Sequence, residues 1–398
     1  MDGYESYIKS ATLKGAQGIP SALTAVVNKD GHYVYKHTAG YGGVASDAKP
    51  LHFDTTFNIA SCTKLITSIA ILQLVERGII GLDDPINTIL PEFASQPIVE
   101  QNLDGSFKLQ KSTGSITLRH LMTHTSGSTY DWMDAKLAAW RASRGETPKI
   151  LMDGDIAAGY AYPRSFDTGE GWGYGGGLDW AGLLVSRLSK KGLEEYVDEN
   201  IARPLNITSF TWHLPQKPAV ADKCVTLAVR QDDGSLVEDK SADFPDPVSE
   251  GGGLGMYANV HDYMRVLADL LKEIPTLLRK DTVDLMFSPQ LKEGTRAFSA
   301  FTSEGGPTYQ PVYGNSLKGV KANHSLAGMI LMADVTRQDY FKPKGTLSWT
   351  GLPNLFWNIN RERGLALMFA TQLLPYGDSK CVDAVARFET AVWRNLKP

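Results

Sequence analysis

The sequence predicts an α/β fold of the α+β kind, with one antiparallel sheet built from both ends of the chain and a helical domain inserted between them. Two observations support this prediction. Apolar runs at both ends alternate with short turns, as the strands of an antiparallel sheet do, and helical patterns flank them. The middle of the chain instead carries helix-length apolar patterns, joined by segments rich in Gly, Pro, Ser and aromatic residues.

The beginning of the chain is expected to form a helix followed by a hairpin. A helix is predicted over about residues 3–14, a strand at 23–28 and a second strand at 32–35. The turn at 29–31 contains Asp-Gly, which between two apolar runs is a strong hairpin signal.

The end of the chain predicts three more strands and a closing helix. The strands are expected at 345–349, 355–360 and 365–371, with a polar turn at 361–364, and the helix at about 379–396. Since both ends supply strands, one sheet flanked by terminal helices is the simplest arrangement.

The segment between the two ends predicts helices at 117–123, 178–189 and 193–201. The expected domains are a discontinuous sheet domain of residues 1–95 and 205–398 and a mainly helical domain of residues 96–204. An active site is expected in the cleft between them. Residues 231–247 are polar and rich in turn formers, and they predict a surface hairpin or loop.

Composition and charge favour small molecules as partners. The 398 residues are 42% hydrophobic, enough for a sizeable core, and the net charge of −4 is spread without long runs of either sign. We therefore expect no nucleic-acid partner and, without a span of roughly 20 apolar residues, no membrane partner. The acidic beginning does not resemble a secretory signal, and three distant cysteines fit a reducing compartment, so a cytoplasmic location is expected.

The first candidate for chemistry is a serine and a lysine three residues apart. Ser61 and Lys64 begin an apolar segment that reads as a buried helix ending near Gly78. Residues at i and i+3 share a helix face, so the lysine can reach the serine hydroxyl. Burial and the positive helix end make the charged lysine costly, which suits a base that activates serine. The alternative is a helix cap with a solvated lysine, which fits an apolar helix badly.

The second candidate is Tyr174, which lies in the glycine-rich segment 171–177 just ahead of a predicted helix. Glycines on both sides let the backbone turn tightly and present the phenol to a cleft. A phenol near serine and lysine can relay protons to a leaving group. The alternative is a glycine-rich loop with a structural aromatic residue.

The third candidate is the strand end at 345–354. There Gly351 lets the backbone approach a bound carbonyl group. The N–H of Ser61, together with that of Gly351 or Leu352, would then form an oxyanion hole. The alternative is an ordinary strand end.

Other patterns do not indicate a metal or a cofactor. His120 and His124 are four residues apart, but the glutamate that a metalloprotease helix places between them is missing, which favours a structural role. The glycine-rich run at 251–255 lacks the Gly-Lys-Ser/Thr of a phosphate loop, and no Gly-x-Ser-x-Gly elbow is present. We predict no cofactor and no metal.

Taken in order, the three motifs resemble the serine β-lactamase and penicillin-binding-protein superfamily, in the branch of class C enzymes, family VIII esterases and transesterases. The resemblance runs nearly the full length, with further markers at 82–85, 116–127, 204–208 and 252–257. Segments at 178–182, 282–287 and 352–357 are similar to the LovD-like fungal acyltransferases. This implies a β-lactamase/transpeptidase-like fold, with Ser61 as acyl acceptor, Lys64 as base and Tyr174 as second proton shuttle.

Two departures from the family pattern point away from β-lactams. The family's Tyr-x-Asn is Tyr-Gly-Gly from Tyr174, and its Lys-Thr-Gly is Trp-Thr-Gly from Trp349. The amide-orienting asparagine and the carboxylate-holding cation are therefore missing, which favours an uncharged or apolar ester or thioester. The residues expected to line the cleft are Trp349, Thr350, Trp172, Tyr130 and, as a looser candidate, Trp132.

The sequence thus predicts a serine acyl-transfer enzyme. Ser61 would take an acyl group from an ester or thioester and pass it to an alcohol of a natural-product acceptor or to water. The expected partners are a small-molecule acyl donor and acceptor, with an acyl thioester carrier as a further candidate donor. The alternatives are a family VIII-type carboxylesterase, a β-lactamase or D-peptidase, and a non-catalytic binding protein that kept the fold.

Overall fold

The computed structural model describes residues 1–15, 17–148, 155–239, 246–303 and 319–398. Its centre is a seven-stranded sheet in the order β2-β1-β15-β14-β13-β10-β9, and every neighbouring pair is antiparallel. Its strands are β1 (Ser21–Asn28), β2 (Tyr33–Gly40), β9 (Ala322–His324), β10 (Met329–Leu331), β13 (Leu347–Gly351), β14 (Leu355–Asn360) and β15 (Leu365–Ala370). Because Leu23 pairs with Ala370, the two ends of the chain meet in one sheet, and the predicted fold class is confirmed.

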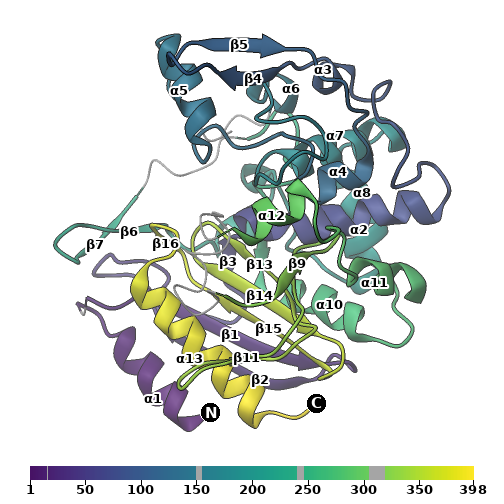
Figure 1. The fold of residues 1–398 in the computed structure, drawn as a ribbon. Coiled ribbons are helices and arrows are strands. Elements are labelled where there is room, and N and C mark those ends of the chain that lie inside the picture. The colour runs from purple at the N-terminus through teal and green to yellow at the C-terminus, as the bar shows by residue number, and fades with distance from the viewer. Residues whose placement is uncertain (16, 149–154, 240–245, 304–318) are drawn as a thin grey trace.

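Helices cover both faces of the sheet, which explains why its central strands are buried throughout. All residues of β14 and β15 are buried. Figure 1 shows α1 (Asp2–Ala11) and α13 (Ser379–Asn395) side by side on one face, where the ring of Phe388 contacts Tyr4 and Tyr35. From the other side, α10 (Val260–Leu271) packs against β1, β14 and β15. A strand covered on both faces has no side exposed to water, so its sequence is mainly apolar. The two polar residues of β14 are hydrogen-bonded, Asn358 to Glu389 and Asn360 to the Lys344 carbonyl.

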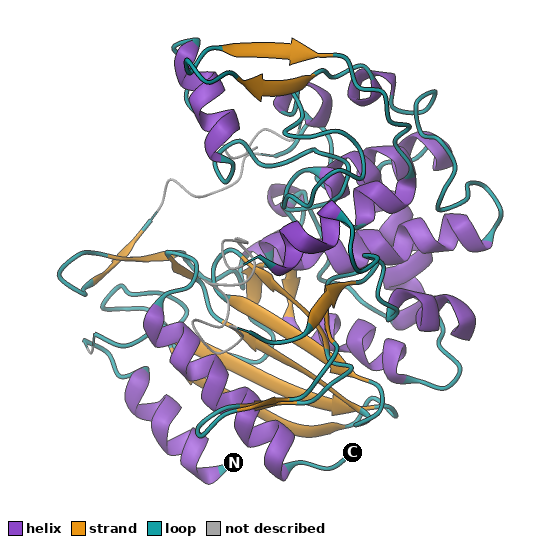
Figure 2. Cartoon of the chain, viewed as in Figure 1, coloured by secondary structure: helices purple, strands orange, loops and turns teal. Residues whose placement is uncertain are grey.

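A mainly helical part lies beside the sheet (Figure 2). It contains the hairpin β4–β5 (Ile98–Gln101, Phe107–Gln110) and the helices α3 (Pro91–Ala94), α4 (Leu118–Met122), α5 (Ala135–Ser143), α6 (Ile156–Gly159), α7 (Gly177–Ser189) and α8 (Leu193–Val197). Helix α2 (Thr63–Glu76) precedes this part in the chain but packs against α7 and α8. The domain boundaries at residues 95 and 204 therefore stay a prediction.

The predicted elements and the observed ones agree closely, with a few differences at their ends. The helix predicted to reach residue 201 is α-helical only to Val197 and continues as a wider turn over Asp198–Ala202. The segment 231–247, expected as a surface hairpin or loop, begins with the turn and second strand of a hairpin. Its strands are β6 (Ala228–Arg230), just ahead of the expected range, and β7 (Leu236–Glu238), and residues 240–245 lie outside the described residues.

Several helices and short strands were not predicted. The helices are α3, α5, α6, α9 (Pro218–Ala221), α10, α11 (Lys280–Met286) and α12 (Arg296–Thr302), and the strands are β3 (Thr56–Asn58), β4, β5, β8 (Tyr257–Asn259), β9, β10, β11 (Val335–Thr336), β12 (Phe341–Lys342) and β16 (Leu373–Leu374). Within the described ranges, no helix has both the length and the apolar character needed to cross a membrane.

Candidate active site

The serine and lysine of the first motif are in contact. Ser61 lies in the short 3-10 turn Ala60–Cys62, which runs directly into α2. The first twelve residues of α2, from Thr63 to Leu74, are all buried, and Lys64 is only 3% exposed. Its Nζ lies 3.1 Å from Ser61 Oγ. The apolar helix thus keeps the lysine out of bulk water and directs it to the half-buried serine.

The backbone just before Ser61 has an unusual conformation. Ala60 has a φ of +43°, a region that residues other than glycine rarely adopt and that costs about 1–3 kcal/mol. The side chain of Asn58 stabilises it by accepting a hydrogen bond from the Ala60 N–H at 2.9 Å. Thr63 Oγ1 donates to the Ala60 carbonyl at 2.6 Å. These hydrogen bonds fix the backbone of the turn and with it the orientation of the Ser61 side chain.

Tyr174 reaches the same serine from the helical part. Its hydroxyl lies 2.7 Å from Ser61 Oγ, and its ring lies 4.7 Å from Lys64 Nζ. The next residue, Gly175, has no room for a side chain, since a Cβ there would lie 2.0 Å from the carbonyl oxygen of Ser128. The glycine therefore lets the chain pass close to a neighbouring loop and turn Tyr174 toward Ser61.

Strand β13 approaches the turn that carries Ser61. A Cβ on Gly351 would lie 2.5 Å from the Ile59 carbonyl oxygen and 3.3 Å from Cys62 Sγ. The following residue, Leu352, is half-buried. Only glycine permits this close approach. It brings the end of β13 beside the serine, where its backbone N–H groups could serve as donors of an oxyanion hole.

Substitution of Gly351 by alanine is expected to reduce turnover of an ester substrate by roughly 10- to 100-fold, because the strand must move away from Ser61 and small displacements of reacting groups are costly. The loss of turnover is measured as the steady-state rate on p-nitrophenyl butyrate. An unfolding curve checks that the variant is folded. The matched control is Gly345→Ala on the turn before β13, where no heavy atom lies within 4 Å of the added Cβ. Gly345 has a φ of +74°, so this control is expected to affect stability more than turnover.

Tyr130 contacts the lysine. Its hydroxyl lies 3.2 Å from Lys64 Nζ and 3.4 Å from Asp179 Oδ2. The side chain is buried, and burial together with the charge of Asp179 raises the pKa of the Tyr130 phenol well above its usual value. Trp132, by contrast, is 39% exposed and stacks on the Tyr130 ring at 5.6 Å.

The remaining residues of the Trp-Thr-Gly strand have separate contacts. Trp349 Nε1 donates a hydrogen bond to the Tyr174 hydroxyl at 3.4 Å. Thr350 Oγ1 is hydrogen-bonded to the Tyr376 hydroxyl at 2.9 Å. A lysine in the Trp349 position would present a cation beside Tyr174, whereas the indole presents an apolar ring and one N–H donor.

Two histidines lie next to these aromatic side chains. The ring of His124 is 4.9 Å from that of Tyr174 and is stacked on Trp349 at 6.1 Å. His324 contacts Trp349 and also Trp172, the other tryptophan expected to line the cleft. Burial lowers the pKa of His124 well below its usual value and that of His324 to about 4. Both imidazoles are therefore neutral near pH 7, so this wall carries no fixed charge.

The two histidines of the His-x-x-x-His pattern have different roles. His120 completes a capping box at the start of α4, where its Nδ1 accepts from the N–H of Thr117 at 3.2 Å. His124 instead has a φ of +58° and packs against Tyr174. No group of three or more metal-binding side chains is found in the part of the chain that the structure describes.

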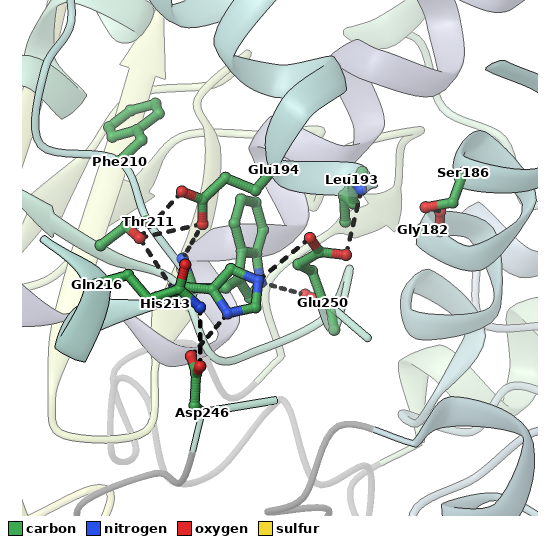
Figure 3. Close-up of polar contacts among 12 residues, drawn as sticks. Gly182, Ser186, Leu193, Glu194, Phe210, Thr211, His213, Gln216, Asp246 and Glu250 are labelled. Atoms are coloured by element: carbon green, nitrogen blue, oxygen red, sulfur yellow. Dashed lines mark hydrogen bonds and ion pairs between the residues drawn. The ribbon is translucent and has the colours of Figure 1, made fainter. Parts of the chain in front are cut away.

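A separate polar cluster surrounds His213 and Glu250, a few residues before Gly253 in the chain (Figure 3). In this cluster the His213 ring bonds Asp246 at 2.7 Å and Glu250 at 3.3 Å. Burial opposes protonation of His213, but the two carboxylates together raise its pKa. Trp212 Nε1 donates to the Gly251 carbonyl at 2.8 Å. The chain is thus fixed on both sides just before Gly253, whose carbonyl accepts from Lys64 Nζ at 2.7 Å.

Comparison with known proteins assigns the family. The family model described as Beta-lactamase matches residues 10–392, and the chain belongs to that family. It is 35% identical over 376 residues to the acyltransferase calJ of Penicillium decumbens, covering 92% of this chain and 87% of that protein. It is 35% identical over 383 residues to the monacolin J acid methylbutanoyltransferase of Aspergillus terreus, covering 94% and 92%. The lovastatin esterase of Penicillium rubens is 31% identical over 389 residues, with 94% of each chain covered.

Solved structures agree with this assignment. The unliganded simvastatin synthase LovD of Aspergillus terreus superposes with a TM-score of 0.85 at 32% identity, covering 98% of this chain and 97% of that one. The fold is therefore β-lactamase-like, as the motifs implied. Within the family, the chain is most similar in these comparisons to proteins named as acyltransferases and esterases.

Proposed function

We propose that the chain is a serine acyltransferase that forms an ester on Ser61 and passes the acyl group to an alcohol. The observation that carries the proposal is the position of Ser61 Oγ, 3.1 Å from Lys64 Nζ and 2.7 Å from the Tyr174 hydroxyl. A serine with two proton-transfer groups in hydrogen-bond reach can both lose a proton and have one returned to a leaving group.

In the first half of the proposed reaction, Ser61 Oγ attacks the carbonyl carbon of an ester or thioester donor. The neutral amine of Lys64 takes the serine proton, and the carbonyl oxygen becomes an oxyanion. The N–H of Ser61 and that of Gly351 or Leu352 stabilise this charge. The bond from carbon to the leaving oxygen or sulfur then breaks, and Lys64 or Tyr174 returns the proton to the leaving group.

In the second half, an acceptor alcohol attacks the acyl-Ser61 ester. Its proton passes to Tyr174 or Lys64 and then to Ser61 Oγ, which leaves as the regenerated hydroxyl. Water in place of the alcohol gives hydrolysis with the same residues, so a carboxylesterase is the second candidate function. The similarity to the methylbutanoyltransferase supports acyl transfer to an alcohol, and the similarity to the lovastatin esterase supports hydrolysis.

The proposed substrates are uncharged at the reacting end. Trp349 stands where the family pattern has a lysine, and the neighbouring His124 and His324 are neutral, so no fixed cation of these groups would hold a substrate carboxylate. This disfavours a β-lactamase or D-peptidase. By analogy with the named relatives, we propose a small natural-product alcohol as acceptor and a small acyl ester or thioester, including one on an acyl carrier, as donor. We propose a cytoplasmic location and a substrate cleft between the two predicted domains.

The proposed function can be tested with p-nitrophenyl butyrate, with and without a high concentration of a small alcohol. For an acyltransferase we expect a stoichiometric burst of p-nitrophenol, then slow release that the alcohol accelerates. Fast release that does not respond to alcohol would instead identify an esterase. Absence of both burst and turnover in folded protein would refute the enzyme and favour a binding protein.

A further inference from the structure

A buried carboxylate lies one hydrogen bond away from the groups that surround Lys64. Asp179, in the first turn of α7, is 0% exposed. Its Oδ1 accepts the N–H of Gly253 at 2.8 Å, and its Oδ2 accepts the hydroxyls of Tyr160 at 2.8 Å and Tyr130 at 3.4 Å. An ionised carboxylate is purely an acceptor, and all three partners can donate. The contacts therefore fit the ionised form of Asp179.

The directions of the hydrogen bonds link Asp179 to the lysine in two ways. In its ammonium form Lys64 Nζ can only donate, so the Tyr130 oxygen accepts from it at 3.2 Å and keeps its own hydrogen for Asp179. In the second link, the Gly253 carbonyl accepts from Lys64 at 2.7 Å, while its N–H donates to Asp179. Together with Ser61 Oγ, these groups provide three acceptors for the three N–H bonds of an ammonium.

The charge of Asp179 can compensate a positive charge on Lys64. Burial raises the pKa of Asp179, and the nearby Lys64 partly opposes that effect. Among the residues that the structure describes, the other titratable groups that face Lys64 are Tyr130, Tyr174, His124 and Cys62. Burial raises the pKa of Tyr130 and Cys62 and lowers that of His124, so these three are uncharged near neutral pH. A positive charge gained by Lys64 is therefore compensated by Asp179.

We propose that Asp179 is a positioning residue that completes a Ser61–Lys64–Asp179 arrangement. Through Tyr130 and Gly253 it orients the lysine, and it stabilises the ammonium that forms when Lys64 takes the proton of Ser61. A nucleophile, a base and a third group that orients the base form a general catalytic arrangement. The inference rests on the proposed function, since Lys64 matters to the reaction only if Ser61 is the nucleophile.

The test measures the rate at which a fluorophosphonate labels Ser61 as a function of pH. In this reaction the Ser61 oxygen forms a bond to phosphorus, the P–F bond breaks, and the serine proton goes to Lys64. Asp179→Asn is expected to be labelled about 10 to 100 times more slowly on the alkaline plateau. The acid limb of its pH profile is expected to move to lower pH, because the ammonium loses its nearby carboxylate. Tyr130→Phe keeps that charge but breaks one link, so labelling slows with a smaller movement of the limb.

The matched control is Asp269→Asn in α10. Asp269 is also 0% exposed and also accepts backbone hydrogen bonds, from Thr276 and Leu277, and it is expected to keep the wild-type profile. A folded Asp179→Asn variant with the wild-type rate and acid limb would overturn the inference, as would equal changes in the Asp269 control. If Asp179→Asn does not fold, the Tyr130→Phe variant provides the test. A wild-type dependence of its labelling rate on pH would overturn the inference. Failure of the wild-type protein to label at Ser61 would instead refute the proposed function.

Discussion

Substitution of Ser61 by alanine is expected to remove the p-nitrophenol burst and to lower turnover of p-nitrophenyl butyrate by roughly 10⁴-fold or more, because the acyl-enzyme cannot form without the serine oxygen. Lys64→Met should lower it by a similar factor, since residues that act as a unit show non-additive losses. The double variant is therefore expected to be hardly slower than either single variant. Burst amplitude, steady-state rate and intact-protein mass after incubation with the ester measure these effects.

The matched control for Ser61→Ala is Ser68→Ala. Ser68 lies on the same helix α2, is 1% exposed, and has no role in the proposed reaction. It is expected to keep wild-type kinetics at some loss of stability. If turnover and acylated mass survive in Ser61→Ala, the acyl-Ser61 mechanism is wrong whatever the folding state of the control.

Five of the seven strands of the sheet could be predicted from the sequence because they have a local signature, whereas the three-residue strands β9 and β10 are too short to show one. Strand β14 was expected at 355–360 and occupies Leu355–Asn360, since an apolar run lies there between two turn segments. Helix α10 could also have been found. Its apolar residues at 260, 263, 264, 267, 270 and 271 follow helical spacing and face the sheet.

The three proposed reacting residues could be selected from sequence because each belongs to a motif with a physical reason for its spacing or its glycines. The groups around them could not. Asp179 reads as an ordinary polar residue of a helix, and only the folded chain places it in a fully buried position beside Tyr130 and Tyr160. His324 lies 200 residues away from His124 in sequence, so no local pattern connects the two rings.

A second large effect is expected at a buried ion pair that joins α13 to the short strand β12. Lys342 and Glu389 are both fully buried, and Lys342 Nζ lies 3.3 Å from Glu389 Oε1. The same carboxylate accepts from Asn358 on β14 at 2.7 Å and from Tyr340 at 2.6 Å. Burial lowers the pKa of Lys342, whereas Glu389 acts to raise it. The contacts with Glu389 thus offset part of the desolvation of the lysine.

Lys342→Met is expected to lower the free energy of unfolding by about 3–5 kcal/mol, because it leaves the Glu389 carboxylate buried without its cation. The midpoint and slope of urea unfolding measure this. The double variant Lys342→Met with Glu389→Gln removes both charges and is expected to recover much of the loss. Lys280→Ala, which breaks an exposed pair with Asp284, is the control and should change stability by less than about 1 kcal/mol. A Lys342→Met variant no less stable than this control would mean that the ion pair contributes nothing to holding α13, and that apolar packing and the hydrogen bonds of Glu389 with Asn358 and Tyr340 hold the helix without it.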